Sequence, residues 1–308
     1  MNSSSPSQAQ LRLAQLAAHL VVALVALVVV GGATRVMEAG LACPDWPLCF
    51  GSLIPGRQMN VQVFLEWFHR LDAFFVGVLL IVQLCLAVIW RDQLPRWLPW
   101  VYTLLLLLVV FQGALGALTV LQLLPSGVVI AHLAVALLLV ALMSGLTQRL
   151  LSTRHIAPPL WWRLMSGFSF IAVFSQCLIG SRMATTWAAQ RCLIQGQDCQ
   201  WLDLHRNSAI PVTSCILLFV ITSFVAGRWS RAQWRFLLTV TFLVFSQAAF
   251  GFLTLHFELH QPLITVFHQL VAALLVACLA ALSCRSPQDK EEPLSEINQE
   301  SLFEACHG

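Results

Sequence analysis

Long apolar segments separated by short polar ones form the main pattern of this chain. Eight of these segments come close to the roughly 20 residues that a helix needs to cross a bilayer. They cover residues 13–33, 65–89, 100–122, 127–148, 163–183, 206–227, 234–256 and 264–284. The pattern predicts an all-α integral membrane protein with eight transmembrane helices. Because the first segment lacks the small-residue cleavage site of a signal peptide, we expect it to be retained.

The composition agrees with this interpretation. Of the 308 residues, 58% are hydrophobic and 10% are charged, whereas charged residues make up about a quarter of ordinary soluble domains. The formal net charge of +3 and a single lysine, Lys290, exclude the basic surface of a nucleic-acid-binding protein. The environment that this composition indicates is membrane lipid.

Basic residues are unevenly distributed between the two sides of the predicted membrane domain. Alternate loops place eleven of them on one side and six on the other. Because basic residues favour the cytoplasmic side of a membrane, both termini are expected in the cytoplasm. The long loop at 34–64 is then expected on the outer face.

Four histidines occur in two pairs of equal spacing. His69 and His132 are 63 residues apart (132 − 69 = 63), and so are His205 and His268 (268 − 205 = 63). All four are expected near the outer ends of their helices. Two imidazoles can occupy both axial positions of a heme iron, whereas a lone intramembrane histidine is often only a hydrogen-bonding partner between helices. The matched pairs favour heme ligation by both.

Further matches indicate that the chain is duplicated. Residues 112–119 recur as 247–254 at an offset of 135, with glutamine, glycine and threonine in the same places, and residues 180–182 echo 33–35. Each copy has an even number of helices, so a pseudo-two-fold axis along the membrane normal is expected to relate the copies. The predicted organisation is a cytoplasmic tail at 1–12, a four-helix bundle at 13–150, a linker at 151–163, a second four-helix bundle at 164–284 and a disordered cytoplasmic tail at 285–308.

Glu66 is the main chemical difference between the two copies. It precedes His69 by three residues, so both side chains share a helix face and Glu66 is expected to point toward whatever His69 binds. A structural alternative is that Glu66 caps a helix N-terminus. The matching position before His205 is Leu202. The first copy is therefore the better candidate for chemistry.

Two arginines directly follow a histidine. Arg70 comes after His69, and Arg206 comes after His205. Each arginine can reach a heme propionate or extend to the lipid headgroups. The sequence leaves both interpretations open.

Two close cysteine pairs occupy matching outer loops. They are Cys43 with Cys49 and Cys192 with Cys199. An oxidising compartment outside the membrane favours a disulfide in each loop. For the first pair, a redox-active dithiol or a metal site is the alternative.

These motifs together resemble the heme A synthase family. The resemblance covers essentially the whole chain except its tails, and the cysteine-loop and glutamate–histidine–arginine strings are its most specific parts. The matching segments are Gly31-Gly-Ala-Thr-Arg35, Gly40-Leu-Ala-Cys-Pro-Asp-Trp-Pro-Leu-Cys49-Phe-Gly51, Glu66-Trp-Phe-His69-Arg70, Ala131-His132-Leu133, His205-Arg206-Asn207 and His268-Gln269.

The resemblance implies an enzyme that oxidises a methyl group of heme O to a formyl group by successive hydroxylations. The product, heme A, would serve cytochrome oxidase. A bacterial-type member in the plasma membrane is expected, with the hemes and cysteine loops toward the outer face. A heme O synthase as donor of the substrate and a homo-oligomeric state are further expectations, and the electron acceptor is unidentified.

The resemblance also assigns roles to residues of the two copies. It implies that His69 and His132 hold the substrate heme and that Glu66 is essential. It implies that His205 and His268 hold a heme b. It further implies that the first cysteine pair forms a disulfide that matters for turnover or heme handling.

Two other functional classes fit parts of the pattern. A non-catalytic b-type cytochrome that passes electrons to a quinone would use the four histidines but not Glu66. A quinone-linked disulfide oxidoreductase would use the cysteine pairs but leaves the histidines unexplained. Heme O or heme A extracted beside heme b would favour the synthase, whereas heme b alone would favour the cytochrome.

Overall fold

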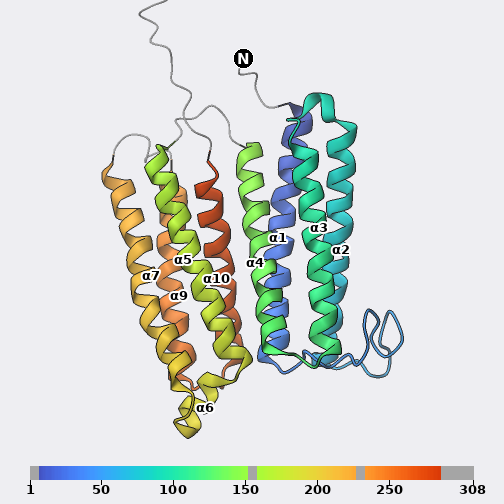
Figure 1. Ribbon diagram of the computed structural model, residues 1–308, viewed down its shortest axis with the longest axis vertical. Helices are drawn as coiled ribbons and strands as arrows, with labels where there is room; N and C mark the ends of the chain where they lie inside the picture. The colour runs from blue at the N-terminus through green and yellow to red at the C-terminus, as the bar shows by residue number, and fades with distance from the viewer. Residues whose placement is uncertain (1–6, 152–157, 227–232, 286–308) are drawn as a thin grey trace, which may run out of the picture.

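The computed structural model describes residues 7–151, 158–226 and 233–285, and within these ranges the fold is helical (Figure 1). Eight helices are long and apolar enough to cross a membrane. They are α1 (Gln8–Val36), α2 (Val61–Ile89), α3 (Leu98–Leu121), α4 (Ser126–Leu151), α5 (Leu160–Thr185), α7 (Cys199–Val225), α9 (Trp234–His256) and α10 (Pro262–Ser283). The predicted all-α class with eight membrane-spanning helices is confirmed.

Several helices begin earlier than the apolar segments that predicted them. α2 begins at Val61 rather than near 65, because the side chain of Asn60 accepts a hydrogen bond from the Val63 N–H and caps the helix. α7 begins at Cys199 rather than near 206. The first turns mix polar residues, Gln62 in α2 and Gln200 in α7, with apolar ones, so the continuous apolar segments begin later than the helices do.

Two short helices lie outside the apolar segments and were not predicted. The 3₁₀ helix η1 (Arg91–Gln93) follows α2, and α6 (Ala188–Gln195) lies between α5 and α7. α6 ends at Gly196, whose φ of 67° is a left-handed conformation that favours glycine. The eight residues of α6 make about two turns, which are too few to give a clear helical pattern.

The spanning helices form two groups that lie side by side in Figure 1. In the first group α1 packs on α2 and α4, and α3 packs on α2 and α4. In the second, α5 packs on α7 and α10, and α9 packs on α7 and α10. The groups meet where α10 contacts α1 and α4, and where α4 contacts α5. The contacts of α1 with α10 and of α5 with α4 are equivalent under the proposed duplication, while the symmetry axis itself stays a prediction.

Small residues allow α4 and α10 to approach closely at this boundary. The Ser144 hydroxyl donates to the Ala277 carbonyl at 2.8 Å. A Cβ added to Gly145 would lie 2.7 Å from the Cys284 sulfur. Small residues are typical of tight contacts between membrane helices, where van der Waals packing drives association.

Parts of the predicted organisation fall outside the described residues. They are residues 1–6 of the N-terminal tail, 152–157 of the linker, 227–232 of the second bundle and 286–308 of the C-terminal tail. The predicted disorder and location of these segments stay predictions.

Candidate functional site

The four histidines form two pairs of equal geometry, one in each group of helices. The ring centres of His69 on α2 and His132 on α4 are 6.4 Å apart, with an angle of 67° between the ring planes. The ring centres of His205 on α7 and His268 on α10 are also 6.4 Å apart, at 75°. The equal spacing in sequence therefore corresponds to equal spacing in space.

The pairs also lie at similar depth. His132, His205 and His268 each come six residues after the first residue of their helix (132 − 126, 205 − 199 and 268 − 262). His69 comes eight residues after Val61. All four thus lie within the first turns of helices that start at the same end of the molecule (Figure 1).

A glycine on the preceding spanning helix lies against each histidine ring. A Cβ at any of these glycines would come within 3.3 Å of the histidine Cε1 atom, which is tighter than ordinary van der Waals contact. The distances are 2.8 Å from Gly31 to His69, 3.3 Å from Gly116 to His132, 3.0 Å from Gly180 to His205 and 3.1 Å from Gly251 to His268. A larger residue at any of these positions would require the histidine ring to shift.

Three of the four histidines also have a glutamine partner one turn before that glycine. The Gln112 amide donates to the His132 carbonyl at 3.0 Å, and the Gln247 amide lies 3.2 Å from the His268 ring. Gln176 donates to the His205 carbonyl at 2.7 Å and lies 3.2 Å from its ring nitrogen. The pattern Gln-x₃-Gly thus marks α3, α5 and α9, whereas α1 has Leu27 at the position four residues before its glycine.

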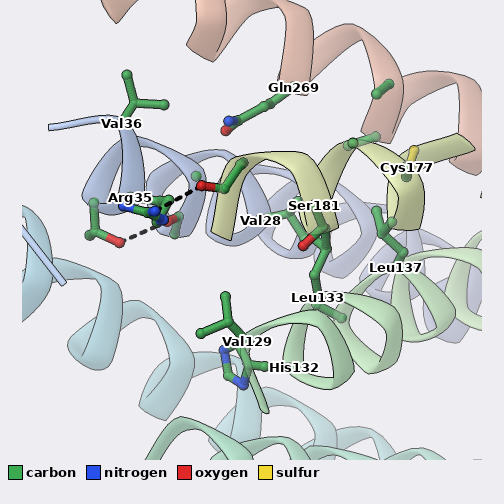
Figure 2. Close-up of a pocket in the computed structure, with 18 of the residues that line it drawn as sticks. Val28, Arg35, Val36, Val129, His132, Leu133, Leu137, Cys177, Ser181 and Gln269 are labelled. Carbon is green, nitrogen blue, oxygen red and sulfur yellow. Dashed lines mark hydrogen bonds between the residues drawn. The ribbon is translucent and has the colours of Figure 1, made fainter. Parts of the chain in front are cut away.

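A single continuous cavity of about 1900 Å³ is lined by all four histidines. Its walls are mainly apolar, and Figure 2 shows His132 on one side of it and Gln269 of α10 on another. The volume is roughly twice the upper end, about 1000 Å³, of pockets that hold one small ligand. The cavity is large enough for more than one bound group.

The histidine geometry fits a heme iron in each pair. Two metal–nitrogen bonds of about 2.0 Å, plus roughly 1.1 Å from each ring centre to its nitrogen, add to about 6 Å, close to the observed 6.4 Å. The Nδ1 atoms of His69, His132 and His268 are buried without a hydrogen-bond partner in the described structure. Buried polar atoms are rarely left unpaired, so these nitrogens are consistent with rings placed for metal ligation.

Glu66 and Arg70 close the outer end of the first site. Glu66 is 4% exposed and lines the cavity together with His69. One carboxylate oxygen pairs with Arg70 at 2.5 Å, and the other accepts the Cys43 N–H at 2.8 Å. Glu66 does not cap α2, because Asn60 does.

Arg70 binds the cysteine loop rather than pointing freely into the cavity. Its guanidinium donates to the backbone carbonyls of Asp45, Leu48 and Cys43 as well as to Glu66. These bonds satisfy carbonyls of a loop that has no regular secondary structure. Arg70 therefore joins the loop to α2, which neither of its two sequence interpretations included.

A disulfide and a carboxylate fix the shape of this loop. Cys43 and Cys49 are joined by a disulfide and are 0% and 1% exposed. The Asp45 carboxylate accepts the N–H groups of Phe50 and Gly51, both at 2.7 Å. The hydrogen bond from Gly51 is the main reason that the pKa of Asp45 lies below its ordinary value.

The second site has a different outer end. Leu202, which is 4% exposed, stands where the first site has Glu66, and Arg206 lines the cavity with its side chain exposed. Within the described residues Arg206 makes no hydrogen bond or ion pair. The second disulfide, Cys192–Cys199, joins α6 to the start of α7. Among the described residues, Leu202 and Arg206 therefore form no ion pair like that of Glu66 and Arg70.

The chain matches a known protein family over most of its length. A family model described as "Cytochrome oxidase assembly protein" matches residues 14–280, which include all four histidines, both disulfides and Glu66. The chain belongs to this family. The resemblance of the motifs to heme A synthases is confirmed, because the relatives that this chain matches are named heme A synthase.

Three of these relatives match over most of their length. A heme A synthase of Shewanella oneidensis is 28% identical, with 83% of this chain and 91% of the relative aligned. One of Caulobacter vibrioides is 29% identical over 84% of this chain and 92% of the relative. One of Shouchella clausii is 27% identical over 76% and 83%. The chain is therefore related to these heme A synthases across both groups of helices.

Some site residues of this family member were not found by sequence reasoning. The glycines Gly31 and Gly180 and the amide of Gln176 were missed, although the Gln-x₃-Gly string would have revealed the last two. The contact with the histidines also corrects the repeat register. Gly31 corresponds to Gly180, an offset of 149, so the echo of 33–35 in 180–182 is out of register by two residues.

Proposed function

We propose that this protein is a heme A synthase that oxidises a methyl group of heme O to a formyl group. The observation that carries the proposal is the first histidine pair, 6.4 Å apart, in a cavity that a buried Glu66–Arg70 pair also borders. An intramembrane carboxylate beside a metal-binding pair is a functional candidate by default. The family and the names of its relatives agree with this function.

The two sites have different roles in this proposal. His69 and His132 hold the substrate heme O, and His205 and His268 hold a resident heme b. The resident heme supplies one-electron redox chemistry when bound. Gln176 and Gln247 fix the orientation of the second pair through their contacts with these histidines, because a ligand is oriented by its outer partners.

Glu66 gives the first site its chemistry in this proposal. Its carboxylate lies on the same helix face as His69, one turn away, and borders the same cavity. It supplies a fixed negative charge where positive charge develops on the substrate, and an acceptor for a proton. Arg70 and the Cys43 N–H hold the carboxylate in place, so its position does not depend on the substrate.

The proposal includes a location and partners. The protein lies in a bacterial plasma membrane with both termini in the cytoplasm, and the disulfides and histidine pairs face outward. Heme O reaches it from a heme O synthase, and heme A leaves for cytochrome oxidase. The two groups of helices act as a catalytic bundle at 13–150 and a heme b bundle at 164–284. Homo-oligomers are also part of the proposal.

The test compares the purified protein with its Glu66→Gln variant. The variant keeps the size and hydrogen-bonding capacity of the side chain but loses its charge. We expect it to retain both hemes in the visible spectrum while extracted heme shifts from heme A to heme O. Asp203→Asn is the matched control, since Asp203 is an exposed carboxylate near the second pair, and it should leave product formation unchanged. Normal heme A formation by Glu66→Gln would refute the assignment.

The competing b-type cytochrome is separated by the same extraction. It would hold heme b alone in both sites, and the Glu66 variant would leave the extracted pigment unaltered. The buried ion pair of Glu66 and Arg70 favours the synthase, because an electron-transfer site needs no buried carboxylate at this position.

A further inference from the structure

Arg35 is a cation that borders the cavity and has no role in the reaction proposed above. It lies at the outer end of α1 and lines the cavity with its side chain half-buried. Arg35 follows Gly31 by four residues, so it shares the helix face that contacts His69 and stands one turn closer to the outer end. Figure 2 shows it between His132 of α4 and Gln269 of α10 in that view.

The second group of helices holds the Arg35 guanidinium in place. Its Nη2 donates to the Ala184 carbonyl of α5 at 2.8 Å, and the guanidinium carbon lies 4.0 Å from the centre of the Trp187 ring. Both partners are uncharged. In the described part of the chain no carboxylate lies within ion-pair distance of Arg35, although the exposed Glu38 also borders the cavity.

A half-buried cation that no carboxylate approaches within ion-pair distance is suited to bind an anionic ligand. A guanidinium carries five N–H donors in a planar fork that matches a carboxylate. One of them is used by Ala184, which leaves donors for a group in the cavity. Charge-assisted bonds of this kind are among the strongest in proteins.

The position is specific to the first site. In the register set by Gly31 and Gly180, the residue that corresponds to Arg35 is Ala184 (35 + 149 = 184). Arg70, the other arginine of the first site, is already bonded to Glu66 and the cysteine loop. Arg35 is therefore the cation of the first site that remains available for a ligand.

We infer that Arg35 binds a propionate carboxylate of the heme held between His69 and His132. The inference rests on the proposed function, since it names the group of the substrate that the first site recognises. Because Ala184 and Trp187 position the guanidinium, the second bundle contributes to substrate recognition by the first.

The experiment measures how each protein distinguishes a free propionate from an ester. Iron protoporphyrin IX and its dimethyl ester are titrated into the purified full-length protein, followed by Soret absorbance. The His69→Ala form of each protein is titrated in parallel, so that the difference reports binding at the first site. The proteins are the wild type, Arg35→Gln, Arg35→Lys and, as matched control, Arg182→Gln. Arg182 lies in the last turn of α5, donates a hydrogen bond to the Ser126 hydroxyl and does not line the cavity.

We expect the wild type and Arg182→Gln to bind the free acid more tightly than the ester. Arg35→Gln should lose about tenfold of that preference, equivalent to about 1.4 kcal/mol, and Arg35→Lys should lose less because it keeps the charge. An unchanged second-site spectrum shows that each variant is folded.

Each contrary outcome has a separate meaning. An equal affinity of the wild type for acid and ester, or an Arg35→Gln protein with the full preference, would overturn the role of Arg35 and leave the proposed function standing. Absence of any His69-dependent binding in the wild type would overturn the proposed function itself. The wild-type comparison needs no variant of Arg35, so the inference stays testable if Arg35→Gln does not fold.

Discussion

The two histidine pairs have nearly the same frame and different surroundings. Each has ring centres 6.4 Å apart and a glycine against each ring. At the outer end, however, the first pair has the buried Glu66–Arg70 ion pair and a loop bonded to it, whereas the second has Leu202 and an exposed Arg206. The equal frames agree with the predicted duplication, and the polar outer end accounts for the proposed difference in function.

This difference shows at which part of such a scaffold catalytic groups can be added. The frame depends on close packing of helices, which tolerates little change. The outer end consists of a loop and the first turns of helices, where polar groups can be added while the frame is kept. The positively charged side chain of Arg35 and the negatively charged side chain of Glu66 both lie at this end of the first site.

Removal of a histidine should have the largest effect and should separate the two sites. His132→Ala deletes one of the two proposed heme ligands in the first pair, so heme affinity there and product formation should fall by more than about 100-fold, the upper end for loss of an outer partner alone. His268→Ala should instead remove the resident heme and leave first-site binding in place. Heme extraction and visible spectra measure both. If His132→Ala and His268→Ala lost the same heme, the two sites would not have separate roles.

Replacement of Glu66 by the residue of the second site should have the next largest effect. Glu66→Leu leaves Arg70 and the Cys43 N–H without their buried acceptor. Breaking a buried pair in this way costs about 3–5 kcal/mol. We expect faster proteolysis of residues 43–60 and loss of product. Leu202→Met, a volume-conserving change at the equivalent place, should cost less than about 1.5 kcal/mol. A loop as resistant in Glu66→Leu as in the wild type would contradict this account.

An added methyl group at the glycines should have a moderate effect on both sites. Gly31→Ala and Gly251→Ala place a Cβ 2.8 and 3.1 Å from a histidine ring, and overpacking of this kind costs about 1–3 kcal/mol. Heme content and the visible spectrum should change at the first site for Gly31→Ala and at the second for Gly251→Ala. Gly113→Ala is the control, because nothing lies within 4 Å of its Cβ. Equal effects of all three variants would show that the glycine contacts do not support the rings.

Acidification should have the smallest effect, through the Asp45 carboxylate of the first loop. The pKa of Asp45 is lowered in the folded protein, chiefly by the Gly51 N–H, from an ordinary value of 3.8. Its carboxylate therefore stabilises the loop above pH 3.8, and this contribution is lost as the pH falls through the lower folded value. Amide exchange of Phe50 and Gly51 should quicken in that range, and Asp45→Asn should abolish the pH dependence. Amide exchange that still quickened with acid in Asp45→Asn would contradict this account.

Apolar segments and spacing were enough to predict the spanning helices and the histidine pairs. Three features of the structure could not be predicted in this way, each for a physical reason. The starts of α2 and α7 were placed too late, because their first turns mix polar with apolar residues and so lie outside the continuous apolar segments. The partner of Arg70 depends on how an irregular loop folds over α2, and no local pattern encodes that. The role of Gly31 arises from the packing of α1 against the His69 ring, so it became visible only with both helices in place.

The continuous cavity has a consequence for the life of the protein in the cell. A hollow of about 1900 Å³ inside a membrane bundle lacks the packing contacts that its walls would otherwise make. A ligand that binds only the folded state adds stability by mass action, about 2.7 kcal/mol at a free concentration of 100 times Kd. The folded amount of this protein should therefore follow the supply of heme. Cells short of heme would then lose the enzyme as well as its substrate, because the empty form would be degraded first.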